Sequence, residues 1–342
     1  MTAIRYMFPA AHRLHLLARY LRRSPVCPGQ PPTAVIATTH RCNLTCRMCI
    51  RAVRPFDASA MEFALFRKII DEGVPHLRYI SFDGPGETIM NPDAFPMIRY
   101  AKSRGLRVMF STNATLLESG IIDDILNAGV DQIIFSINGA TPGVYAAVHG
   151  RNCYDQAVAN VHSFIARKLQ RRAKILVAVQ MIRLPETIPE VGLFYARWRH
   201  VPGVDFVRVK KDVVCNGATP KSRPTQRHNP CPRLWHGPVF VETNGDVYPS
   251  PGVMYNAGPV GNIREKSLGD IWNGERMQAM RRAHARGDLS DVPECRLCNY
   301  PRPRLPLIVA GFLLNPFVAG KFVPLAEKLA FWHNIPIFER MD

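Results

Sequence analysis

Short apolar runs alternate with longer amphipathic stretches from residue 33 to about residue 210. The expected strands span residues 34–38, 77–82, 107–111, 131–137, 174–181 and 204–209. Helices of ten or more residues fit between them, at residues 61–73, 93–104, 116–128, 154–168 and 188–198. Regular alternation of strand and helix predicts a parallel sheet built from right-handed βαβ units. We therefore expect an α/β fold with its active groups at the carboxyl ends of the strands.

The segment before this pattern is expected to form an amphipathic helix over residues 4–23, interrupted near Pro9. Leu14, Leu17 and Leu21 recur at spacings of three and four, which places them on one helical face. Arginines 13, 19, 22 and 23 supply positive charge. Such a helix can pack on the rest of the fold or bind an anionic lipid surface, and the sequence leaves both open. The proline-rich residues 25–32 form a linker.

Beyond residue 212 the strand–helix alternation stops. Residues 239–248 read as a β-hairpin with the turn Asn244-Gly245-Asp246. Ser267 is expected to open a helix that runs to about residue 285. Residues 306–322 are apolar but too short to span a bilayer, which takes about 20 residues. This tail either docks on the fold or dips into a membrane interface.

The charge of the chain is strongly positive, since 44 Lys and Arg against 27 Asp and Glu give +17. Such an excess suits nucleic acid, an anionic membrane surface or a phosphorylated substrate, or reflects a generally basic surface. We expect no nucleic-acid partner. The first 23 residues lack the apolar core of a secretion signal, and nine clustered cysteines indicate a reducing compartment. The expected location is the cytoplasm, with peripheral membrane association as one reading.

Three cysteines stand in one short loop directly after the first expected strand. Cys42, Cys46 and Cys49 have CxxxCxxC spacing, and three thiolates this close can hold three corners of an iron–sulfur cube. The fourth iron then stays open to an outside ligand. A zinc site with His40 as fourth ligand is the alternative that the spacing leaves open.

This loop resembles that of the radical S-adenosylmethionine (SAM) enzymes, whose signature is CxxxCxxC after the first strand of a partial (β/α)6 barrel. The resemblance implies that Cys42, Cys46 and Cys49 hold a [4Fe–4S] cluster whose open iron binds SAM. One electron, from a donor such as flavodoxin or ferredoxin, would cleave SAM to a 5′-deoxyadenosyl radical that takes a hydrogen atom from the substrate. The protein would supply binding and orientation.

The ends of the later strands resemble the same family. The sequence Asp83-Gly84-Pro85-Gly86-Glu87 after the second strand is similar to the family's GGE motif, which meets the SAM amino group, and glycine permits close backbone approach to a ligand. The resemblance implies further SAM contacts at the ends of the third, fourth and fifth strands. These residues are Ser111 and Asn113, Ser136 and Asn138, and Met181, the last as an apolar surface for adenine.

The region after residue 212 resembles the SPASM and shorter twitch extensions of radical SAM enzymes, which carry auxiliary iron–sulfur clusters. Cys231 is followed by Gly245 at the family's spacing, and Cys295 and Cys298 form a CxxC pair. The resemblance implies one auxiliary [4Fe–4S] cluster held by Cys231, Cys295 and Cys298. Its fourth iron could bind Cys215, bind Ser250 or stay open, and zinc at this site is the alternative. Cys27 and Cys153 read as ordinary thiols.

These patterns divide the chain into four parts. They are a basic N-terminal segment with linker (1–32), the radical SAM core (33–212), a SPASM-like domain (213–300) and an apolar tail (301–342). We expect a radical SAM enzyme that acts on an organic substrate, small or lipid-linked, in a biosynthetic pathway. Residues 1–32 are too short for a separate leader-binding domain, which disfavours a peptide-modifying enzyme. That enzyme and an iron–sulfur electron carrier or scaffold are the two alternatives.

Overall fold

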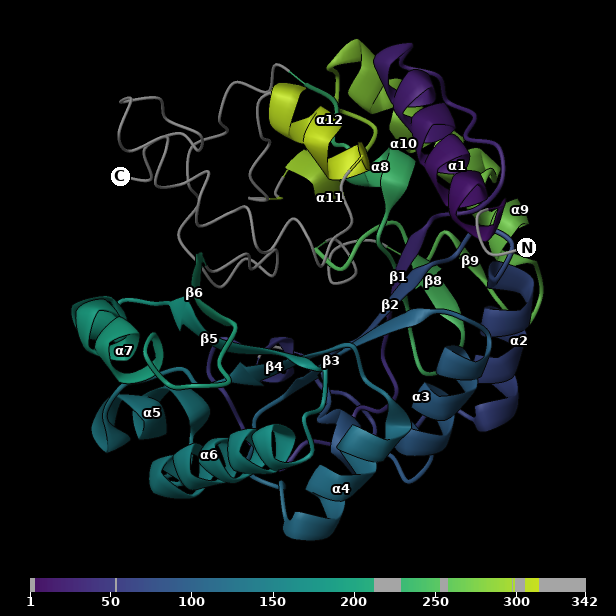
Figure 1. Ribbon diagram of the computed structural model, residues 1–342. Coiled ribbons are helices and arrows are strands. Elements are labelled where there is room, and N and C mark those ends of the chain that lie inside the picture. The colour runs from purple at the N-terminus through teal and green to yellow at the C-terminus, as the bar shows by residue number, and fades with distance from the viewer. Residues whose placement is uncertain are drawn as a thin grey trace.

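The computed structural model describes residues 4–52, 54–211, 229–252, 258–296, 298 and 305–313, with only the backbone described for residues 4–10 and 211. Six parallel strands form its centre: β1 (Thr33–Ile36), β2 (Tyr79–Phe82), β3 (Arg107–Thr112), β4 (Gln132–Ser136), β5 (Leu176–Arg183) and β6 (Phe206–Lys211). Each overlaps an expected strand. Helices follow the strands and lie on the outer side of the curved sheet (Figure 1). The expected α/β architecture is confirmed.

The helices that cover this outer side match the expected segments with one addition. They are α2 (Phe63–Gly73), α3 (Ala94–Ser103), α4 (Ser119–Ala128), α6 (Tyr154–Gln170) and α7 (Val191–Trp198), with single turns η1 (Ile50–Ala52), η2 (Thr88–Met90) and η3 (Ile188–Glu190). The addition is α5 (Pro142–His149), which the sequence analysis did not predict. Its signals are Thr141, whose hydroxyl accepts from the Val144 N–H, Pro142 in the first turn, and left-handed Gly150 at the end.

The sheet continues from the expected barrel into the C-terminal region. Strand β7 (Val239–Val241) pairs in parallel with β1, and β8 (Asp246–Tyr248) and β9 (Gly261–Asn262) follow antiparallel. The order is β6-β5-β4-β3-β2-β1-β7-β8-β9, so the barrel is open and β1 lies inside the sheet. The expected hairpin is confirmed, with Gly245 at a positive φ of 94° in its turn.

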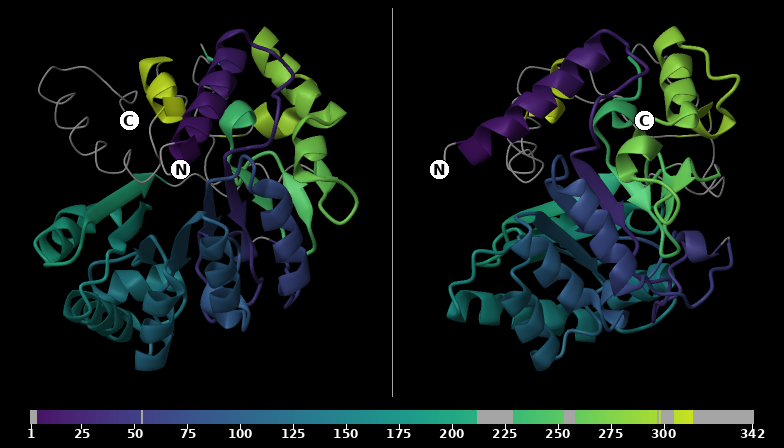
Figure 2. Two further views of the ribbon diagram at one scale, coloured as in Figure 1. Left: turned by 45° about the vertical axis from the view of Figure 1, so that its right-hand side comes forward. Right: turned by 90° about the vertical axis from the view of Figure 1, so that its right-hand side faces the viewer.

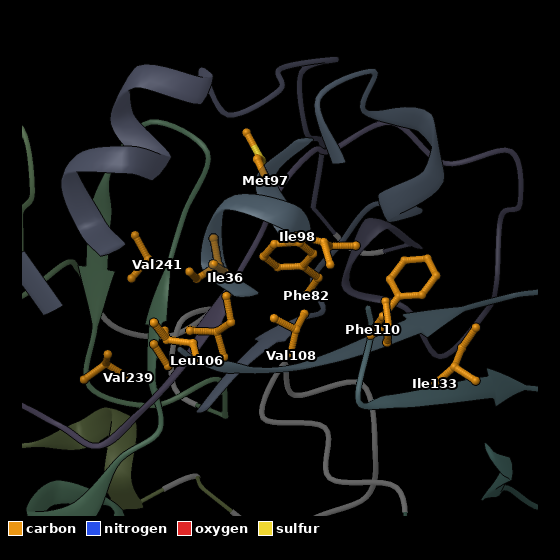
Figure 3. Packing of buried hydrophobic residues seen from close by; sticks show 14 of the residues in the cluster. Ile36, Phe82, Met97, Ile98, Leu106, Val108, Phe110, Ile133, Val239 and Val241 are labelled. Atoms are coloured by element: carbon orange, nitrogen blue, oxygen red, sulfur yellow. The ribbon is translucent and has the colours of Figure 1, made fainter. Parts of the chain in front are cut away.

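The main core lies between the strands and the outer helices. Ile36, Phe82, Val108, Phe110 and Ile133 from successive strands are all fully buried. Figure 3 shows them packed with Met97 and Ile98 from α3 and with Val239 and Val241 from β7. One apolar layer therefore spans both the expected barrel and the C-terminal hairpin.

Helix α1 (Ile4–Leu21) runs without a break through Pro9, so the expected interruption is wrong. Pro9 is the sixth residue of α1, past the first turn in which proline is well tolerated, and it removes one backbone hydrogen bond without ending the helix. Leu16, Leu17 and Tyr20 are buried, and the Tyr20 hydroxyl donates to the Pro230 carbonyl at 3.0 Å. The face of Leu16, Leu17 and Tyr20 therefore packs on protein, whereas Leu14 and Leu21 of the expected apolar face are each 53% exposed.

The C-terminal helices gather around α1 on the other side of the sheet (Figure 2). They are α8 (Arg233–His236), α9 (Leu268–Trp272), α10 (Glu275–Arg286), α11 (Pro293–Arg296) and α12 (Leu305–Leu313). Helix α12 docks on the fold, since Phe312 contacts the rings of Tyr20 and His236. Residues 314–322 of the expected apolar tail lie outside the described residues. No helix in the described part of the chain is long and apolar enough to cross a bilayer.

The helix expected from Ser267 to about residue 285 is two helices instead of one. Ser267 caps α9, since its hydroxyl oxygen accepts from the Asp270 N–H at 3.1 Å. The chain then leaves the helix at Asn273 and Gly274 before α10 begins. Glycine favours such a break because it loses the most conformational freedom inside a helix. The break lets Arg281 of α10 donate to the Trp272 carbonyl at the end of α9.

Candidate functional site

The cysteine loop follows β1 at the carboxyl edge of the sheet. Its three thiols lie within electrostatic reach of one another: the pKa of Cys46 is raised by burial and further by Cys49 and Cys42. Burial is also the largest cause that raises the pKa of Cys42 and of Cys49. Within the described ranges, no group of three His, Cys, Asp or Glu side chains is arranged to hold a single metal ion. The thiols face a shared, partly desolvated region.

Hydrogen bonds tie this loop to the ends of the next two strands. The Glu87 N–H after β2 donates to the Arg41 carbonyl at 2.7 Å. One Glu87 carboxylate oxygen accepts from the Asn113 N–H after β3 at 2.8 Å, and the Asn113 side chain donates to the Asn43 side chain at 3.0 Å. The expected site residues Glu87 and Asn113 are therefore brought together with the cysteine loop.

The glycines after β2 are needed for this contact. A β-carbon at Gly86 would lie 2.1 Å from the Thr39 carbonyl oxygen and 2.8 Å from the Arg41 carbonyl oxygen. At Gly84 it would lie 3.0 Å from the Ala37 β-carbon. The close backbone approach that these glycines permit is made, in this structure, to the cysteine loop itself.

Glu87 carries unusual electrostatics for a carboxylate. Burial raises its pKa to about 7, against the lowering effect of the Asn113 N–H. Its second oxygen, Oε1, is buried with no hydrogen-bond partner among the described residues. A buried acceptor without a donor costs free energy, so this oxygen suits a ligand that brings an N–H or O–H group.

His149 at the end of α5 contacts the loop and was missed by the sequence analysis. Its Nδ1 lies 3.1 Å from the Cys46 sulfur, and its Nε2 lies 3.2 Å from the Asn138 backbone nitrogen. Burial lowers the pKa of His149 to about 4, so the ring is neutral at pH 7. Only the Thr-Pro start and glycine end of α5 could have pointed to this residue.

The other expected site residues lie on two faces of the sheet. Ser111 and Ser136 are half-buried at the ends of β3 and β4. The Asn138 side-chain oxygen accepts from the Ile182 N–H at 2.7 Å, which ties the end of β4 to β5. Met181 is fully buried in the main core and is not brought to the other site residues. Because side chains alternate along a strand, its neighbour Gln180 takes the opposite face.

His40, the fourth ligand of the zinc alternative, has both ring nitrogens engaged elsewhere. Nδ1 lies 2.8 Å from the Asp57 carboxylate, and Nε2 contacts Glu242, which follows β7. These carboxylates raise the pKa of His40 although burial, the largest single cause, opposes them. A cavity of about 450 Å³ lies beside this group. His40 thus links the first strand's loop to the C-terminal hairpin.

The second cysteine group lies among the C-terminal helices. Cys231 precedes α8, and its N–H donates to His284 of α10 at 3.4 Å. Cys295 is buried in α11, and Cys298 is partly buried beyond it. The Ser250 hydroxyl accepts from Arg233 at 2.9 Å and from the Gly252 N–H at 3.3 Å. Cys215 lies outside the described residues.

Comparison with known families decides what this arrangement is. A model of the radical SAM superfamily matches residues 36–190, and the SPASM model of an iron–sulfur cluster-binding domain matches residues 231–299. The chain is a radical SAM enzyme with a C-terminal SPASM domain. The radical SAM match begins in β1 and covers the cysteine loop, and the SPASM match begins at Cys231.

Two relatives of this radical SAM enzyme are named for the modification or the synthesis of a cofactor. A tungsten-containing aldehyde ferredoxin oxidoreductase cofactor-modifying protein from Pyrococcus furiosus is 26% identical over 290 residues, which cover 70% of this chain and 80% of the relative. An AdoMet-dependent heme synthase from Methanosarcina barkeri is 30% identical over 151 residues, or 43% of this chain, which span only 42% of that relative.

The solved structures that resemble this radical SAM enzyme include SuiB of Streptococcus suis bound to the precursor peptide SuiA. The TM-score is 0.60 at 14% identity, with 77% of this chain and 69% of SuiB covered. At this identity the likeness shows the fold alone. The partial (β/α)6 barrel expected from the sequence is confirmed.

The two domains define the cofactors of this radical SAM enzyme. The first domain binds a [4Fe–4S] cluster and SAM, and the second binds auxiliary iron–sulfur clusters. The thiols of Cys42, Cys46 and Cys49 beside β1 fit a [4Fe–4S] cluster that binds SAM, because three thiols on one loop leave one iron of the cube without a protein ligand. The unpartnered oxygen of buried Glu87 stands beside that loop and fits an amine-bearing ligand.

Proposed function

We propose that this enzyme cleaves SAM reductively and takes a hydrogen atom from a small organic substrate in the biosynthesis or modification of a cofactor. Cys42, Cys46 and Cys49 hold the SAM-binding cluster in this proposal. When bound, that cluster supplies the electron that cleaves SAM and so starts radical chemistry. The observation that carries the proposal is the cysteine loop at the carboxyl end of β1, joined to Glu87 and Asn113.

The residues around the loop have separate tasks in this proposal. Glu87 and the backbone beside Gly86 receive the SAM amino group, because the free Glu87 oxygen needs a donor. Ser111 and Ser136 line the same edge of the sheet. Asn113 and Asn138 position the loops, since their side chains bond to protein groups. Met181, buried in the core, has no task at the ligand.

Cys231, Cys295 and Cys298 hold one auxiliary cluster in this proposal. The Ser250 hydroxyl already accepts two hydrogen bonds, which favours Cys215 or an open iron over Ser250 as the fourth ligand. An auxiliary cluster can accept the second electron of a two-electron oxidation. Epimerisation, rearrangement and carbon–carbon bond formation are the other outcomes compatible with this architecture.

A cofactor-type substrate is supported by the relative from Pyrococcus furiosus, because its printed role is cofactor modification and the match covers 80% of it. A peptide substrate is the alternative, since SuiB binds a precursor peptide on the same fold. Mass spectrometry of metabolites that accumulate in a deletion strain decides between them. A small molecule consumed by the purified enzyme supports the first, and a modified peptide supports the second.

Reductive cleavage itself is tested on the anaerobically reconstituted protein with SAM and dithionite. SAM-dependent 5′-deoxyadenosine is expected. Its absence from protein with full iron content would instead support an electron carrier or scaffold.

The finer proposal of a membrane surface and a lipid-linked substrate has less support. The apolar face of α1 is largely used for packing, and Leu14 and Leu21, each 53% exposed, are its large apolar side chains left at the surface among the residues whose side chains are described. The charge of +17 still favours an anionic partner. Membrane association therefore remains a prediction.

A further inference from the structure

A row of polar side chains crosses the inner face of the sheet. Ser136 of β4 is paired in register with Gln180 of β5, and Gln180 with Arg208 of β6. One step earlier on the same strands, Ile134, Ala178 and Phe206 are paired in the same way and form a separate apolar cluster. Residues two apart on a strand share a face, so the polar row lies beside this cluster, nearer the carboxyl ends.

This face is the one that the outer helices leave uncovered. The intervening residues Ile133, Phe135, Val177 and Val179 belong to the main core, and Phe135 contacts Phe164 of α6 with ring centres 5.2 Å apart. The helices lie on that outer side in Figure 1. Ser136, Gln180 and Arg208 therefore face the concave side, where the proposed substrate would lie.

Arg208 has no counter-charge among the described residues. Its guanidinium lies 5.2 Å from the Phe206 ring centre, with no ion pair or hydrogen bond to the described part of the chain. Burial alone lowers its pKa, which indicates that no carboxylate stands close enough to raise it. Ser136 and Gln180 likewise have no side-chain partner in the described ranges. Three sets of unused donors thus lie side by side.

The charge around this row is positive. Lys210, two residues further along the same face, is exposed. Burial raises the pKa of Asp83 at the end of β2, and the charge of Lys210 opposes part of that rise. Asp83 is thus within electrostatic reach of Lys210, while no acidic group is among the causes that shift the pKa of Arg208. A guanidinium presents a planar fork of donors that matches a carboxylate or a phosphate.

We propose that Arg208, with Gln180 and Ser136, forms a binding site for an anionic group of the substrate, a carboxylate or a phosphate. The attribution to the substrate rests on the proposed function, since it needs the substrate on the concave face. The carboxylate of SAM is the other possible source of this chemistry. An experiment with separate arms distinguishes the two.

The first arm titrates inorganic phosphate into the reconstituted protein by calorimetry. Wild type should bind it saturably, and Arg208→Gln should weaken binding at least tenfold. Arg183→Gln is the matched control, because Arg183 is exposed on the opposite face of β5, and it should bind as wild type does. Arg208→Lys, which keeps the positive charge, should lose less phosphate affinity than Arg208→Gln. Equal phosphate affinity in wild type and Arg208→Gln would overturn the site.

The second arm titrates SAM into the same proteins. Affinity for SAM should differ less than twofold between wild type and Arg208→Gln, and a tenfold loss would assign the site to SAM and overturn the substrate attribution. Wild-type 5′-deoxyadenosine formation is recorded in parallel. Its absence would contradict the proposed function while the phosphate arm still reports on the anion site.

A second, independent observation concerns the sulfur of Cys46. The Asn138 backbone N–H can only donate, so the His149 Nε2 at 3.2 Å must accept and carries no proton. An imidazole ring without a proton on Nε2 carries its proton on Nδ1, and His149 Nδ1 lies 3.1 Å from the Cys46 sulfur. Gly139 and Gly150 hold α5 close, since β-carbons there would lie 2.6 Å from the Tyr145 nitrogen and 2.3 Å from the Thr45 hydroxyl.

The geometry points to His149 as a positioning residue that donates a hydrogen bond to a cluster sulfur. Such a bond stabilises the added negative charge of a reduced cluster, so it raises the reduction potential. The test compares wild type, His149→Phe and His149→Gln by redox titration with EPR detection at equal iron content. His149→Phe should shift the midpoint potential to more negative values, and His149→Gln, which keeps an N–H donor, should restore part of it. Identical potentials and spectra in all three would overturn this role.

Discussion

The substitution Gly86→Ala tests how the turn after β2 holds the cysteine loop. The added methyl group would lie 2.1 Å from the Thr39 carbonyl oxygen. Backbone on both sides must then separate by about 1.3 Å to reach the 3.4 Å of an ordinary contact. The Glu87 to Arg41 hydrogen bond of 2.7 Å crosses the same gap and would stretch beyond a normal length.

The cost follows from these two effects. Overpacking a close contact typically costs about 1–3 kcal/mol, and a lost backbone hydrogen bond adds about 1 kcal/mol. A loss of about 2–4 kcal/mol is below the total stability of most domains, which is about 5–15 kcal/mol. Gly86→Ala should therefore fold but hold Cys42 and its neighbours out of position.

Urea unfolding under reducing conditions measures the free energy of unfolding. Iron per chain after anaerobic reconstitution measures how well the cysteine loop still binds its cluster. Gly120→Ala is the matched control, because nothing lies within 4 Å of a β-carbon there and Gly120 is in α4. The Gly120→Ala variant should be as stable as wild type or about 0.5–1 kcal/mol more stable, since alanine favours a helix more than glycine does. Equal stability and equal iron in Gly86→Ala and Gly120→Ala would refute the reasoning.

Three further predictions concern pH, the second cysteine group and the membrane. Burial lowers the pKa of His236 to about 4 from 6.5. As the pH drops from about 6.5 to about 4, the unfolded chain therefore takes up a proton at His236 before the folded chain does, and the stability of the fold falls. Thermal melts of His236→Phe should show a weaker fall in melting temperature over this pH range than wild type, and an equal fall would contradict this prediction. Changing Cys231, Cys295 and Cys298 to Ala should remove about half of the reconstituted iron, since two clusters share it, and leave SAM cleavage in place; unchanged iron would mean that these cysteines hold zinc or nothing. In liposome flotation, binding of the protein should need anionic lipid and should weaken with salt, because each basic residue near the surface contributes about 1 kcal/mol. Binding should also fall when Arg19, Arg22 and Arg23 become Gln. If the protein binds neither anionic nor neutral liposomes, the terminal segments are helices that only cover the fold.

The sequence predicts the repeating part of the fold well because each element has a strong local pattern. Every expected strand from 34–38 to 204–209 has its counterpart, since strands in a parallel sheet are continuous apolar runs. The short helix α5 was missed because eight residues carry little periodic signal. Its position against the cysteine loop, and therefore the contact between His149 and Cys46, depends on tertiary packing that no local pattern encodes.

The candidate site was predictable where one loop contains it and less so where strands meet. The three loop cysteines are adjacent in sequence, whereas the row of Ser136, Gln180 and Arg208 depends on the register of three strands. Met181 shows the same limit. In a run that is apolar on both faces, the pattern does not tell which face a residue takes, and Met181 faces the core while Gln180 faces the concave side.

The most direct test of the account is reductive SAM cleavage by the protein in which Cys42, Cys46 and Cys49 are all changed to Ala. The comparison protein carries the same three changes at Cys231, Cys295 and Cys298, so both lack three thiols. The account predicts 5′-deoxyadenosine from the comparison protein and none from the first variant, because each loop thiolate holds one iron of the cluster that binds SAM. Retained 5′-deoxyadenosine production without the loop cysteines would contradict it.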